Sequence, residues 1–254
     1  MMNMNEAFNL DGKVALITGG ATGLGFATAK CMLCSGANVI VVGKSLEKLE
    51  NAKTLVPELD IRQFDITETD KVPGLIESIV NDYGHIDILV NNAGVHCKKP
   101  VEDITMSDLD CVMSVHVKAS LKLTQAVLPY MKEQEDGSVI FISSMSALFG
   151  LSEVAAYGAA KGAILSFTRI IADEVSKYGV RVNALVPGFI DSPMFRKATD
   201  SDPVRRDKIL GRTPMGRYGD AEDIGWGAVY LSSKAARFIT GTELIIDGGC
   251  SIGF

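Results

Sequence analysis

Three residues in the middle of the chain have side chains suited to moving a proton: Ser144, Tyr157 and Lys161. Tyr157 and Lys161 are four residues apart, so on a helix both side chains lie on one face. A phenol has a reference pKa of about 10, and we expect the neighbouring ammonium to lower it by favouring the phenolate. Tyr157 could then act as a general acid or base, while the Ser144 hydroxyl donates to a developing oxyanion.

The same Tyr-x3-Lys spacing occurs a second time, at Tyr230 and Lys234. Ser144 lies 13 residues before Tyr157, whereas the position 13 residues before Tyr230 is Arg217. We therefore interpret Tyr230 as a packing residue.

A second candidate site is the glycine-rich turn Thr18-Gly19-Gly20-Ala21-Thr22-Gly23-Leu24-Gly25, which follows an apolar segment. We expect Gly19 to permit a tight turn, Gly23 to let the backbone approach phosphates, and Gly25 to allow close packing of helix on strand. The N-terminus of the following helix offers N–H groups and a partial positive charge to a pyrophosphate. The turn therefore predicts a dinucleotide site.

Short apolar segments rich in β-branched residues alternate with longer helical stretches along the chain. We expect strands at 13–18, 38–42, 60–64, 86–90, 138–143, 180–186 and 243–246. Segments that are apolar on both faces are typical of a parallel sheet with helices on both sides. Repeated strand–helix units with right-handed crossovers predict an α/β fold, a doubly wound Rossmann-like parallel sheet, with residues 1–254 as a single domain.

Three residues mark the ends of predicted helices. Gly36 follows the first long helix, where a left-handed C-terminal cap favours glycine. Ser45 and Asp220 are expected N-caps of later helices. In such a sheet, the glycine turn and Ser144 both fall at the carboxyl ends of strands, the edge at which ligands bind.

Composition excludes several other classes of protein. Hydrophobic residues make up 47% of the 254 residues, and the mean hydropathy is +0.20, so the chain can bury a large core. The formal net charge of −6 argues against a nucleic-acid-binding protein, which normally presents a basic face. No apolar run is long enough to cross a bilayer and residues 1–12 do not resemble a secretory signal, so we expect a cytoplasmic protein. Cys31 and Cys34 have CxxC spacing but lie in a predicted helix without a second Cys or His pair, so we expect no metal site.

Further motifs accompany these residues in a fixed order: Asn91-Asn92-Ala93-Gly94, Arg181-Val-Asn183, Pro187-Gly188-Phe-Ile-Asp-Ser192 and Asp247-Gly248-Gly249. With the Gly-x3-Gly-x-Gly turn and Tyr157-x3-Lys161, they make the chain resemble the short-chain dehydrogenase/reductase family over essentially its whole length. The resemblance implies an NAD(P)-dependent oxidoreductase that interconverts a carbonyl and a secondary alcohol of a small molecule by hydride transfer. It also implies that Ser144, Tyr157 and Lys161 are catalytic, that Lys161 holds the nicotinamide ribose, and that the protein is a homo-oligomer, commonly a tetramer.

The cofactor preference depends on the end of the second predicted strand. In NAD sites an acidic residue about twenty positions beyond the glycines binds the ribose 2′-hydroxyl, but here Gly43 and Lys44 stand there. Because Lys44 would pair with a 2′-phosphate, we favour NADP(H), with NAD(H) as the alternative. By resemblance, Asp65 and Ile66 flank the adenine, and residues 92–94 line the adenosine ribose. The expected cofactor-binding residues are Gly19, Thr22, Gly23, Leu24, Gly25, Lys44, Asp65, Ile66, Asn92, Ala93, Gly94, Tyr157, Lys161, Pro187, Gly188, Ile190 and Ser192.

One position departs from the family pattern. Family members usually carry an asparagine in the segment that matches residues 115–119, and His116 stands at its position. In the family that asparagine holds a water that links the lysine to solvent. A neutral imidazole could hold the same water and titrate near physiological pH, or it could be a hydrogen-bonded core histidine. His116 is therefore a candidate fourth catalytic residue, and we expect His116→Asn to keep activity while shifting the pH profile.

By resemblance, a segment at about 189–216 closes over the nicotinamide and the substrate. Basic residues outnumber acidic ones in it, and Lys98 and Lys99 follow Gly94, which fits an anionic substrate or a solvated helix face. The two arginines that acyl-carrier-protein reductases of the family use for docking are replaced by Pro129 and Asp173. The alternatives to an NADP(H)-dependent carbonyl reductase are an NAD-dependent sugar or polyol dehydrogenase and a nucleotide-sensing protein without turnover.

Overall fold

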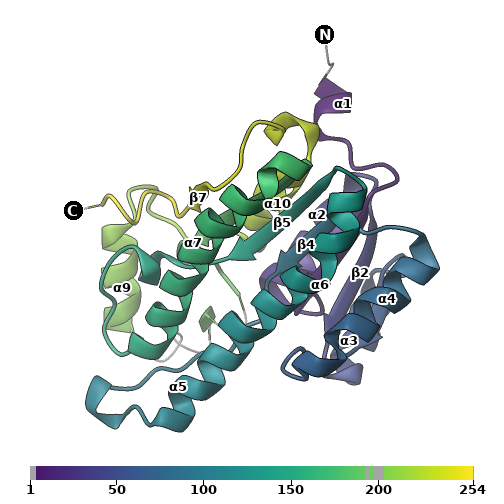
Figure 1. Ribbon diagram of the computed structural model, residues 1–254. Coiled ribbons are helices and arrows are strands. Elements are labelled where there is room, and N and C mark those ends of the chain that lie inside the picture. Colours follow the sequence, from purple (N-terminus) through teal and green to yellow (C-terminus); the bar gives the residue numbers. More distant parts are fainter. Residues whose placement is uncertain (1–3, 193–194, 197–202, 254) are drawn as a thin grey trace.

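A single parallel sheet forms the centre of the molecule. The computed structural model describes residues 4–192, 195–196 and 203–253, and within them seven strands pair in the order β3-β2-β1-β4-β5-β6-β7 (Figure 1). The chain starts in the middle of the sheet and winds outward to both sides, so the predicted doubly wound topology is confirmed. The strands are β1 (Val14–Thr18), β2 (Asn38–Gly43), β3 (Asp60–Gln63), β4 (Ile88–Asn91), β5 (Gly137–Ile142), β6 (Val180–Pro187) and β7 (Glu243–Ile246).

All seven expected strands occur, with ends that differ from the expected ones by at most two residues. The largest difference is at β4, which begins at Ile88. The Asp87 carboxylate accepts the Val14 N–H at 2.8 Å, so the backbone ladder between β1 and β4 begins one residue later, at Ala15 and Ile88.

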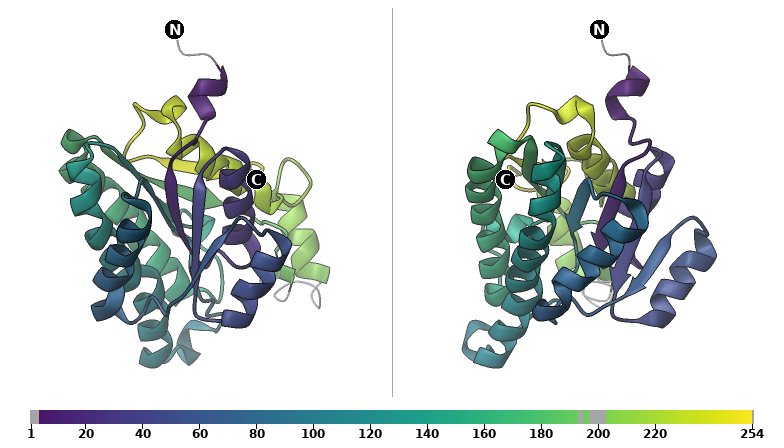
Figure 2. Two further views of the ribbon diagram at one scale, coloured as in Figure 1. Left: turned by 90° about the vertical axis from the view of Figure 1, so that its right-hand side faces the viewer. Right: turned by 45° about the vertical axis from the view of Figure 1, so that its right-hand side comes forward.

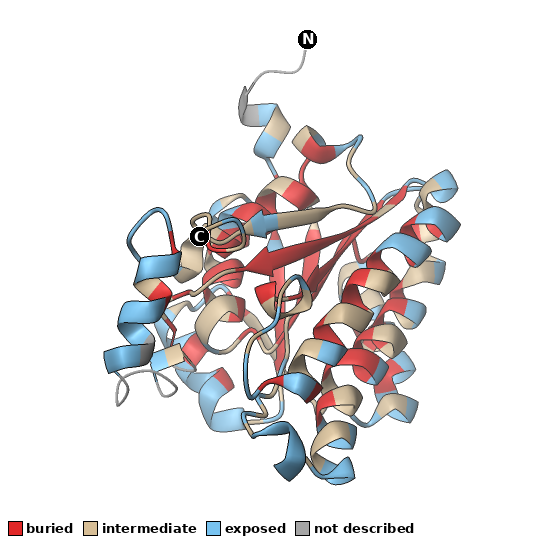
Figure 3. Cartoon of the chain, turned by 90° about the vertical axis from the view of Figure 1, so that its left-hand side faces the viewer, coloured by how far each residue is buried: buried red, intermediate tan, exposed pale blue. Residues whose placement is uncertain are grey.

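Helices cover both faces of the sheet (Figure 2). They bury an apolar core on each side. Buried residues follow the strands and the inner faces of the helices (Figure 3). None of the described helices is both long and apolar enough to cross a bilayer. One face carries α4 (Val72–Tyr83), α6 (Ala119–Glu133) and α7 (Ala155–Val175), and the other carries α2 (Gly23–Cys34), α3 (Leu46–Leu55) and α10 (Ala221–Ser232).

The three predicted helix ends are observed. Gly36 follows α2 with φ of +95°, a left-handed conformation that glycine adopts without strain. Ser45 caps α3, where its hydroxyl accepts from the Lys48 N–H at 3.4 Å. Asp220 precedes α10, and its own N–H is bound by the Asp223 carboxylate at 2.9 Å.

The connections that leave the carboxyl ends of β1 to β6 carry the predicted site residues to one edge of the sheet. A helix that runs through α5 (Met106–Met113), the π-helical turn η3 (Ser114–Lys118) and α6 brings His116 to the same edge. The remaining helices that matter to the site or its lid are the short turn η4 (Met145–Ala147) and α9 (Pro203–Arg212); α1 (Met4–Phe8) precedes the sheet.

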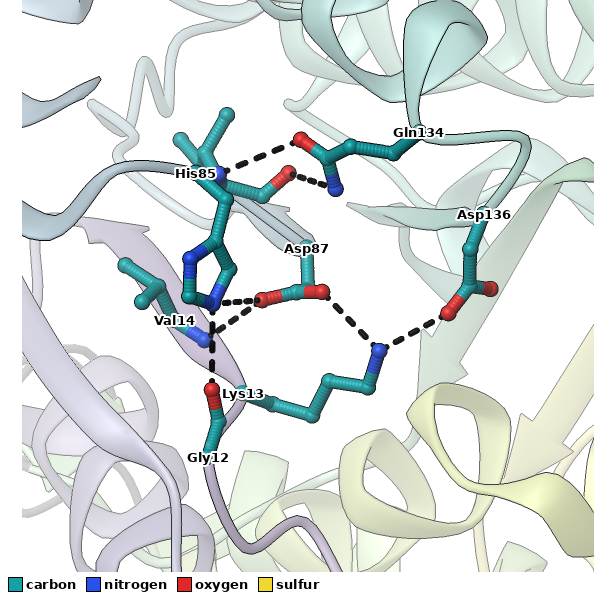
Figure 4. A network of polar contacts seen from close by, with 8 residues as sticks. Gly12, Lys13, Val14, His85, Asp87, Gln134 and Asp136 are labelled. Carbon is teal, nitrogen blue, oxygen red and sulfur yellow. Dashed lines mark hydrogen bonds and ion pairs between the residues drawn. The ribbon is translucent and has the colours of Figure 1, made fainter.

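At the amino-terminal edge of the sheet, charged side chains tie three segments together (Figure 4). Lys13 Nζ lies 2.9 Å from the buried Asp87 carboxylate and 2.8 Å from Asp136. His85 Nε2 lies 3.2 Å from Asp87. This network joins β1 to the segments that lead into β4 and β5, on the side of the sheet away from the predicted site.

Candidate active site

The glycine turn between β1 and α2 has the geometry that its sequence predicted. Gly19 has φ of +64°, and a Cβ there would lie 2.9 Å from Ala93 Cα. Gly23 has φ of +55°, and a Cβ there would meet none of the described atoms within 4 Å. A phosphate can therefore approach the backbone at Gly23, beside the N-terminus of α2.

The third glycine of the turn lets the helix lie directly against the turn. A Cβ at Gly25 would be 2.4 Å from both Asn92 Nδ2 and the Gly19 carbonyl oxygen. Asn92 Nδ2 donates to the carbonyls of Thr18 and Gly19 at 2.9 and 3.2 Å. Thr18 Oγ1 in turn accepts from the N–H groups of Asn92 and Ala93, each at 3.0 Å. The Asn92 amide is thus engaged in holding the turn in shape.

The adenine side of the expected cofactor site lies beyond β2 and β3. Lys44 is exposed just after β2. Hydrogen bonds from Thr67, and to a smaller extent the charge of Lys44, lower the pKa of the Asp65 carboxyl. Ile66 is 7% exposed and packs into the core, so mainly its backbone is available to a nucleotide. Of Lys44, Asp65 and Ile66, Lys44 is therefore the residue whose side chain extends into solvent.

The three predicted catalytic residues converge at the ends of β5 and α7. Ser144 lies just after β5, and its Oγ accepts from the Ser146 N–H at 3.2 Å. Lys161 is buried; its Nζ donates to the Ile142 carbonyl at 2.6 Å and lies 5.5 Å from the centre of the Tyr157 ring. The spacing of the sequence thus places hydroxyl, phenol and amine within one small region.

The protonation states differ from the sequence expectation. Burial raises the pKa of Tyr157, and a hydrogen bond with Ser144 opposes this only in part. Burial also lowers the pKa of Lys161 to about 7. The Lys161 amine by itself therefore does not lower the phenol pKa as expected, because the cost of burying a charge outweighs the attraction between the two groups.

A cavity of about 190 Å³ connects the glycine turn with the catalytic residues. Leu24 from the turn, Ser144, Tyr157 and Gly188 at the end of β6 all line it. The expected lid contributes Phe189, Ile190, Ser192 and Phe195 to the wall; positions 193–194 and 197–202 of that segment lie outside the described residues. Cofactor and substrate positions expected from the sequence thus open into one space.

A larger cavity, of about 440 Å³, lies beside β7 and the first turn of α10. Its lining includes Tyr218, Asp223 and Asp247, and it shares only Ile190 with the first cavity. Because Ser144, Tyr157 and Lys161 do not line it, we assign the chemistry to the smaller cavity.

His116 lies in the π-helical turn between α5 and α6 and is 2% exposed. Its Nε2 lies 2.8 Å from the Val95 carbonyl oxygen and 3.1 Å from the Val95 nitrogen. Burial, assisted by the charge of Lys161, lowers the pKa of His116 to about 3. The expectation that His116 titrates near physiological pH is therefore wrong, and its contacts are those of a hydrogen-bonded core histidine.

Known proteins that resemble this chain are described as reductases or dehydrogenases. A family model described as enoyl-(acyl carrier protein) reductase matches residues 19–251. The 3-oxoacyl-[acyl-carrier-protein] reductase of Thermotoga maritima is 36% identical over 96% of this chain and 99% of its own. The gluconate 5-dehydrogenase of Gluconobacter oxydans is 33% identical, with 99% of each chain covered. A crystal structure of a gluconate 5-dehydrogenase from Burkholderia cenocepacia, in complex with NADP and tartrate, superposes with a TM-score of 0.94 at 30% identity, covering 99% of this chain and all of that one.

The chain belongs to the short-chain dehydrogenase/reductase family. It is an oxidoreductase of the class that interconverts carbonyls and secondary alcohols with a nicotinamide cofactor. NADP(H), the cofactor favoured by the sequence, is the one bound in solved structures of three relatives that are 30–34% identical to this chain. The fold and the glycine turn fit that cofactor: two left-handed glycines and an open backbone face at Gly23 leave room for its pyrophosphate.

The structure of this short-chain dehydrogenase/reductase also brings forward a residue that the sequence reasoning missed. The ring of His96 lies 5.3 Å from that of Tyr157, at an angle of 32°, and His96 lines the smaller cavity. His96 lies five residues after β4, at the carboxyl edge of the sheet, and this position could have identified it from the sequence. Tyr230, interpreted as a packing residue, lies in α10 with its ring 6.2 Å from Phe8.

Proposed function

We propose that this enzyme reduces the keto group of a polyhydroxy acid to a secondary alcohol with NADPH, with Tyr157 as the general acid. The observation that supports this most directly is the single cavity onto which Leu24 of the glycine turn, Ser144 and Tyr157 all open. A dinucleotide on the turn and a carbonyl at Ser144 would then share one space, as hydride transfer requires.

Two kinds of observation support a sugar acid as the substrate. Relatives at 32–36% identity over most of this chain are named as gluconate 5-dehydrogenase, 5-keto-D-gluconate 5-reductase and 2-dehydro-3-deoxy-D-gluconate 5-dehydrogenase. In this chain, Lys98 and Lys99 follow β4 on the side of the sheet that carries the cavity, in ion pairs of 3.3 Å with Glu153 and 2.7 Å with Asp108. The exposed pair formed by Lys98 contributes little to stability, so its ammonium can turn to a substrate carboxylate at small cost.

The second candidate is reduction of a 3-oxoacyl group on acyl carrier protein, which the relative from Thermotoga maritima carries out by name. Pro129 and Asp173 stand where reductases of that kind are expected to carry docking arginines. An aspartate in place of an arginine repels an acidic carrier protein, which favours the sugar acid.

The chain's own residues provide the proton and the orientation. Because burial raises the pKa of Tyr157, the phenol is protonated at neutral pH, which is the form that donates a proton to a carbonyl oxygen. Ser144, which hydrogen-bonds the phenol, can donate to the same oxygen as negative charge develops. When bound, NADPH supplies the hydride to the carbonyl carbon. The Lys161 amine donates to the Ile142 carbonyl, and we assign to it the binding of the nicotinamide ribose and the resupply of the Tyr157 proton.

The remaining cofactor contacts are proposed on the same basis. Lys44 would bind the 2′-phosphate, Gly19 to Gly25 the pyrophosphate, and residues 187–192 the nicotinamide. We also propose that residues 1–254 act as one cofactor-binding domain with a lid at 189–216, and that the protein assembles as a cytoplasmic homotetramer.

Replacement of one phenol tests the mechanism. With NADPH and 5-keto-D-gluconate, Tyr157→Phe is expected to lower kcat by about 10²–10⁴-fold, because the acid that protonates the product oxygen is lost. Tyr230→Phe, at the other Tyr-x3-Lys site, is the matched control and should keep the wild-type rate. Reduction by Tyr157→Phe at an undiminished rate would show that the proposed proton donor is wrong.

A further inference from the structure

His96 occupies a position over the proposed proton donor that the mechanism leaves unused. Its ring centre is 5.3 Å from that of the Tyr157 ring, and the two rings are tilted by 32°. The side chain is exposed and lines the cavity next to Ser144 and Leu24. A substrate with its carbonyl at Ser144 and Tyr157 can therefore place a neighbouring substituent beside His96.

Few polar groups of the cavity wall are available for those substituents. Among the described lining residues, Ser143 Oγ donates to the Lys161 carbonyl at 3.0 Å, and Ser192 Oγ accepts from the Phe195 N–H at 3.2 Å. Ser146 Oγ is buried and has no hydrogen-bond partner among the described residues. Much of the rest of the wall is apolar, contributed by Leu24, Ile142, Met145, Leu151, Val154, Pro187, Phe189 and Ile190.

His116 holds the backbone that carries His96. Its Nε2 contacts both the carbonyl and the nitrogen of Val95, the residue before His96. The loop lies directly on the imidazole, since a Cβ at Gly94 would be 2.5 Å from His116 Cε1. His116 also meets the Tyr157 ring edge-on, with centroids 5.4 Å apart at 87°. One buried imidazole thus sets the loop and the phenol relative to each other.

We propose that His96 recognises a hydroxyl or carboxylate oxygen on the carbon next to the reacting carbonyl, and that His116 positions His96 through the Val95 peptide. An imidazole can both donate to and accept from a hydroxyl, and it donates to a carboxylate. The proposal rests on the proposed reduction and specifies its substrate class: carbonyl compounds with an oxygen substituent on the adjacent carbon. A purely apolar ketone gains nothing from His96.

Binding without turnover gives the first test. Tartrate, a dihydroxy diacid, is titrated calorimetrically into the NADP-loaded protein for wild type, His96→Phe and His85→Phe. Phenylalanine keeps the ring against Tyr157 and removes its hydrogen bonds, so tartrate is expected to bind about 10-fold more weakly to His96→Phe. His85→Phe, at the opposite edge of the sheet, should bind tartrate as wild type does. Equal affinities for wild type and His96→Phe, or no binding to wild type, would overturn the assignment of His96 whether or not the enzyme turns over.

Paired substrates give the second test. We expect His96→Phe to lower kcat/KM about 10- to 100-fold for 3-hydroxy-2-butanone and less than threefold for 2-butanone, both with NADPH. Equal losses on the two ketones would show that His96 acts on the chemistry of Tyr157, and no loss on either would show that it does not touch the substrate. Absence of wild-type activity on both ketones and on 5-keto-D-gluconate counts against the proposed function, while the tartrate titration still judges His96.

The positioning role of His116 has its own readout. His116→Leu removes both contacts to Val95, and the ratio of kcat/KM for 3-hydroxy-2-butanone to that for 2-butanone is expected to fall about 10-fold. A loss of kcat through the contact of His116 with Tyr157 would affect both ketones alike and leave this ratio unchanged. His116→Gln, which keeps a donor and an acceptor, should restore most of the ratio. A loss of stability with an unchanged ratio in a folded His116→Leu would reduce His116 to packing.

Discussion

Tyr157 and Lys161 show how burial decides the charge of a proposed catalytic pair. A pair of opposite charges about 5.5 Å apart gains about 3 kcal/mol at an effective dielectric constant of ~20. The fall in the pKa of Lys161 from 10.5 to about 7 corresponds to several kcal/mol against its charged form, and burial raises the pKa of Tyr157 as well. Both groups are therefore held toward their neutral forms, which suits a phenol that donates its proton during reduction.

The first prediction at the residue scale concerns the proposed contact of Lys44 with the 2′-phosphate of the cofactor. Loss of a charge-assisted contact to the 2′-phosphate costs about 1.5–3 kcal/mol, so Lys44→Ala is expected to raise the KM for NADPH about 10- to 100-fold and to leave the KM for NADH within twofold. Steady-state kinetics with both cofactors measure this. Lys48→Ala, an exposed lysine one turn into α3, is the matched control. A rise that is equal for the two cofactors would remove the role assigned to Lys44.

The buried imidazole of His116 predicts how the free energy of unfolding depends on pH. The folded protein holds its imidazole neutral down to about pH 3, whereas the unfolded chain protonates it below its ordinary pKa of 6.5. The unfolded state thus binds more protons between these values, and this contribution to the free energy of unfolding, complete above pH 6.5, falls as the pH decreases toward 3. Urea unfolding should show the stability of wild type relative to His116→Asn decreasing by about 3 kcal/mol between pH 7 and pH 4.

The same low pKa changes the expectation for activity. Because His116 stays neutral throughout, the pH–rate profile of His116→Asn should keep the shape of the wild-type profile between pH 5 and pH 9. A stability difference that does not vary with pH would show that the imidazole is not shielded from protonation as the structure indicates.

At the scale of elements, the β1–α2 turn requires glycine for two reasons. Gly19 and Gly23 are left-handed, and Gly25 lies too close to neighbouring atoms for a side chain to fit. A methyl group at Gly25 would be 2.4 Å from the Gly19 carbonyl oxygen and from Asn92 Nδ2, and backbone cannot give way there as a flexible side chain can. Gly25→Ala is expected to destabilise the protein by about 1–3 kcal/mol and to weaken NADPH binding at least 10-fold. Thermal unfolding and a fluorescence titration with NADPH measure the two effects.

Gly74 provides the control for this substitution. It lies inside α4, where a Cβ would meet nothing within 4 Å, so Gly74→Ala should stabilise by about 0.5–1 kcal/mol with unchanged NADPH affinity. Gly25→Ala with wild-type stability and affinity would show that the turn tolerates the bulk by moving.

A second element decides the place of His116. The helix through α5 and α6 is interrupted by the π-helical turn at Ser114–Lys118, and such turns are frequent at functional sites because they re-aim side chains. Here the turn brings an imidazole beneath the loop after β4 and against the edge of Tyr157.

At the scale of the whole molecule, the two edges of the sheet have different tasks. The carboxyl edge holds the site, with open backbone and half-buried polar groups. The amino edge is closed by Lys13, Asp87, His85 and Asp136 (Figure 4). Rigidity at this edge fixes β1 and β4, whose other ends carry the glycine turn and residues 92–96.

Removal of Asp87 tests this division. Asp87→Ala leaves the Val14 N–H and the Lys13 ammonium without their buried partner and is expected to lower the free energy of unfolding by about 2–4 kcal/mol. Urea denaturation measures it, with the exposed Asp110→Ala as control. The folded variant should keep its KM for NADPH; a stability equal to that of wild type would show that the network does not hold the sheet together.

Much of the fold follows from local pattern. Short apolar segments rich in β-branched residues predicted all seven strands, and Gly36, Ser45 and Asp220 predicted the ends of three helices, because period and capping chemistry act over a few residues. The glycine turn and the Ser144, Tyr157, Lys161 spacing were readable for the same reason: each lies within one turn or follows a single strand end.

What the sequence alone did not determine is how burial and contacts between distant segments set the chemistry. The phenol pKa rises and the imidazole of His116 stays neutral because burial among surrounding elements penalises the charged form of both groups. His96 contacts Tyr157, which is 61 residues further along the chain, and Val95 contacts His116, which is 21 residues further along. No local sequence pattern predicts such contacts. The chain's residue types and spacing therefore determined the sheet, the cofactor turn and the reacting groups, whereas packing across the carboxyl edge decided their protonation and what stands beside the substrate.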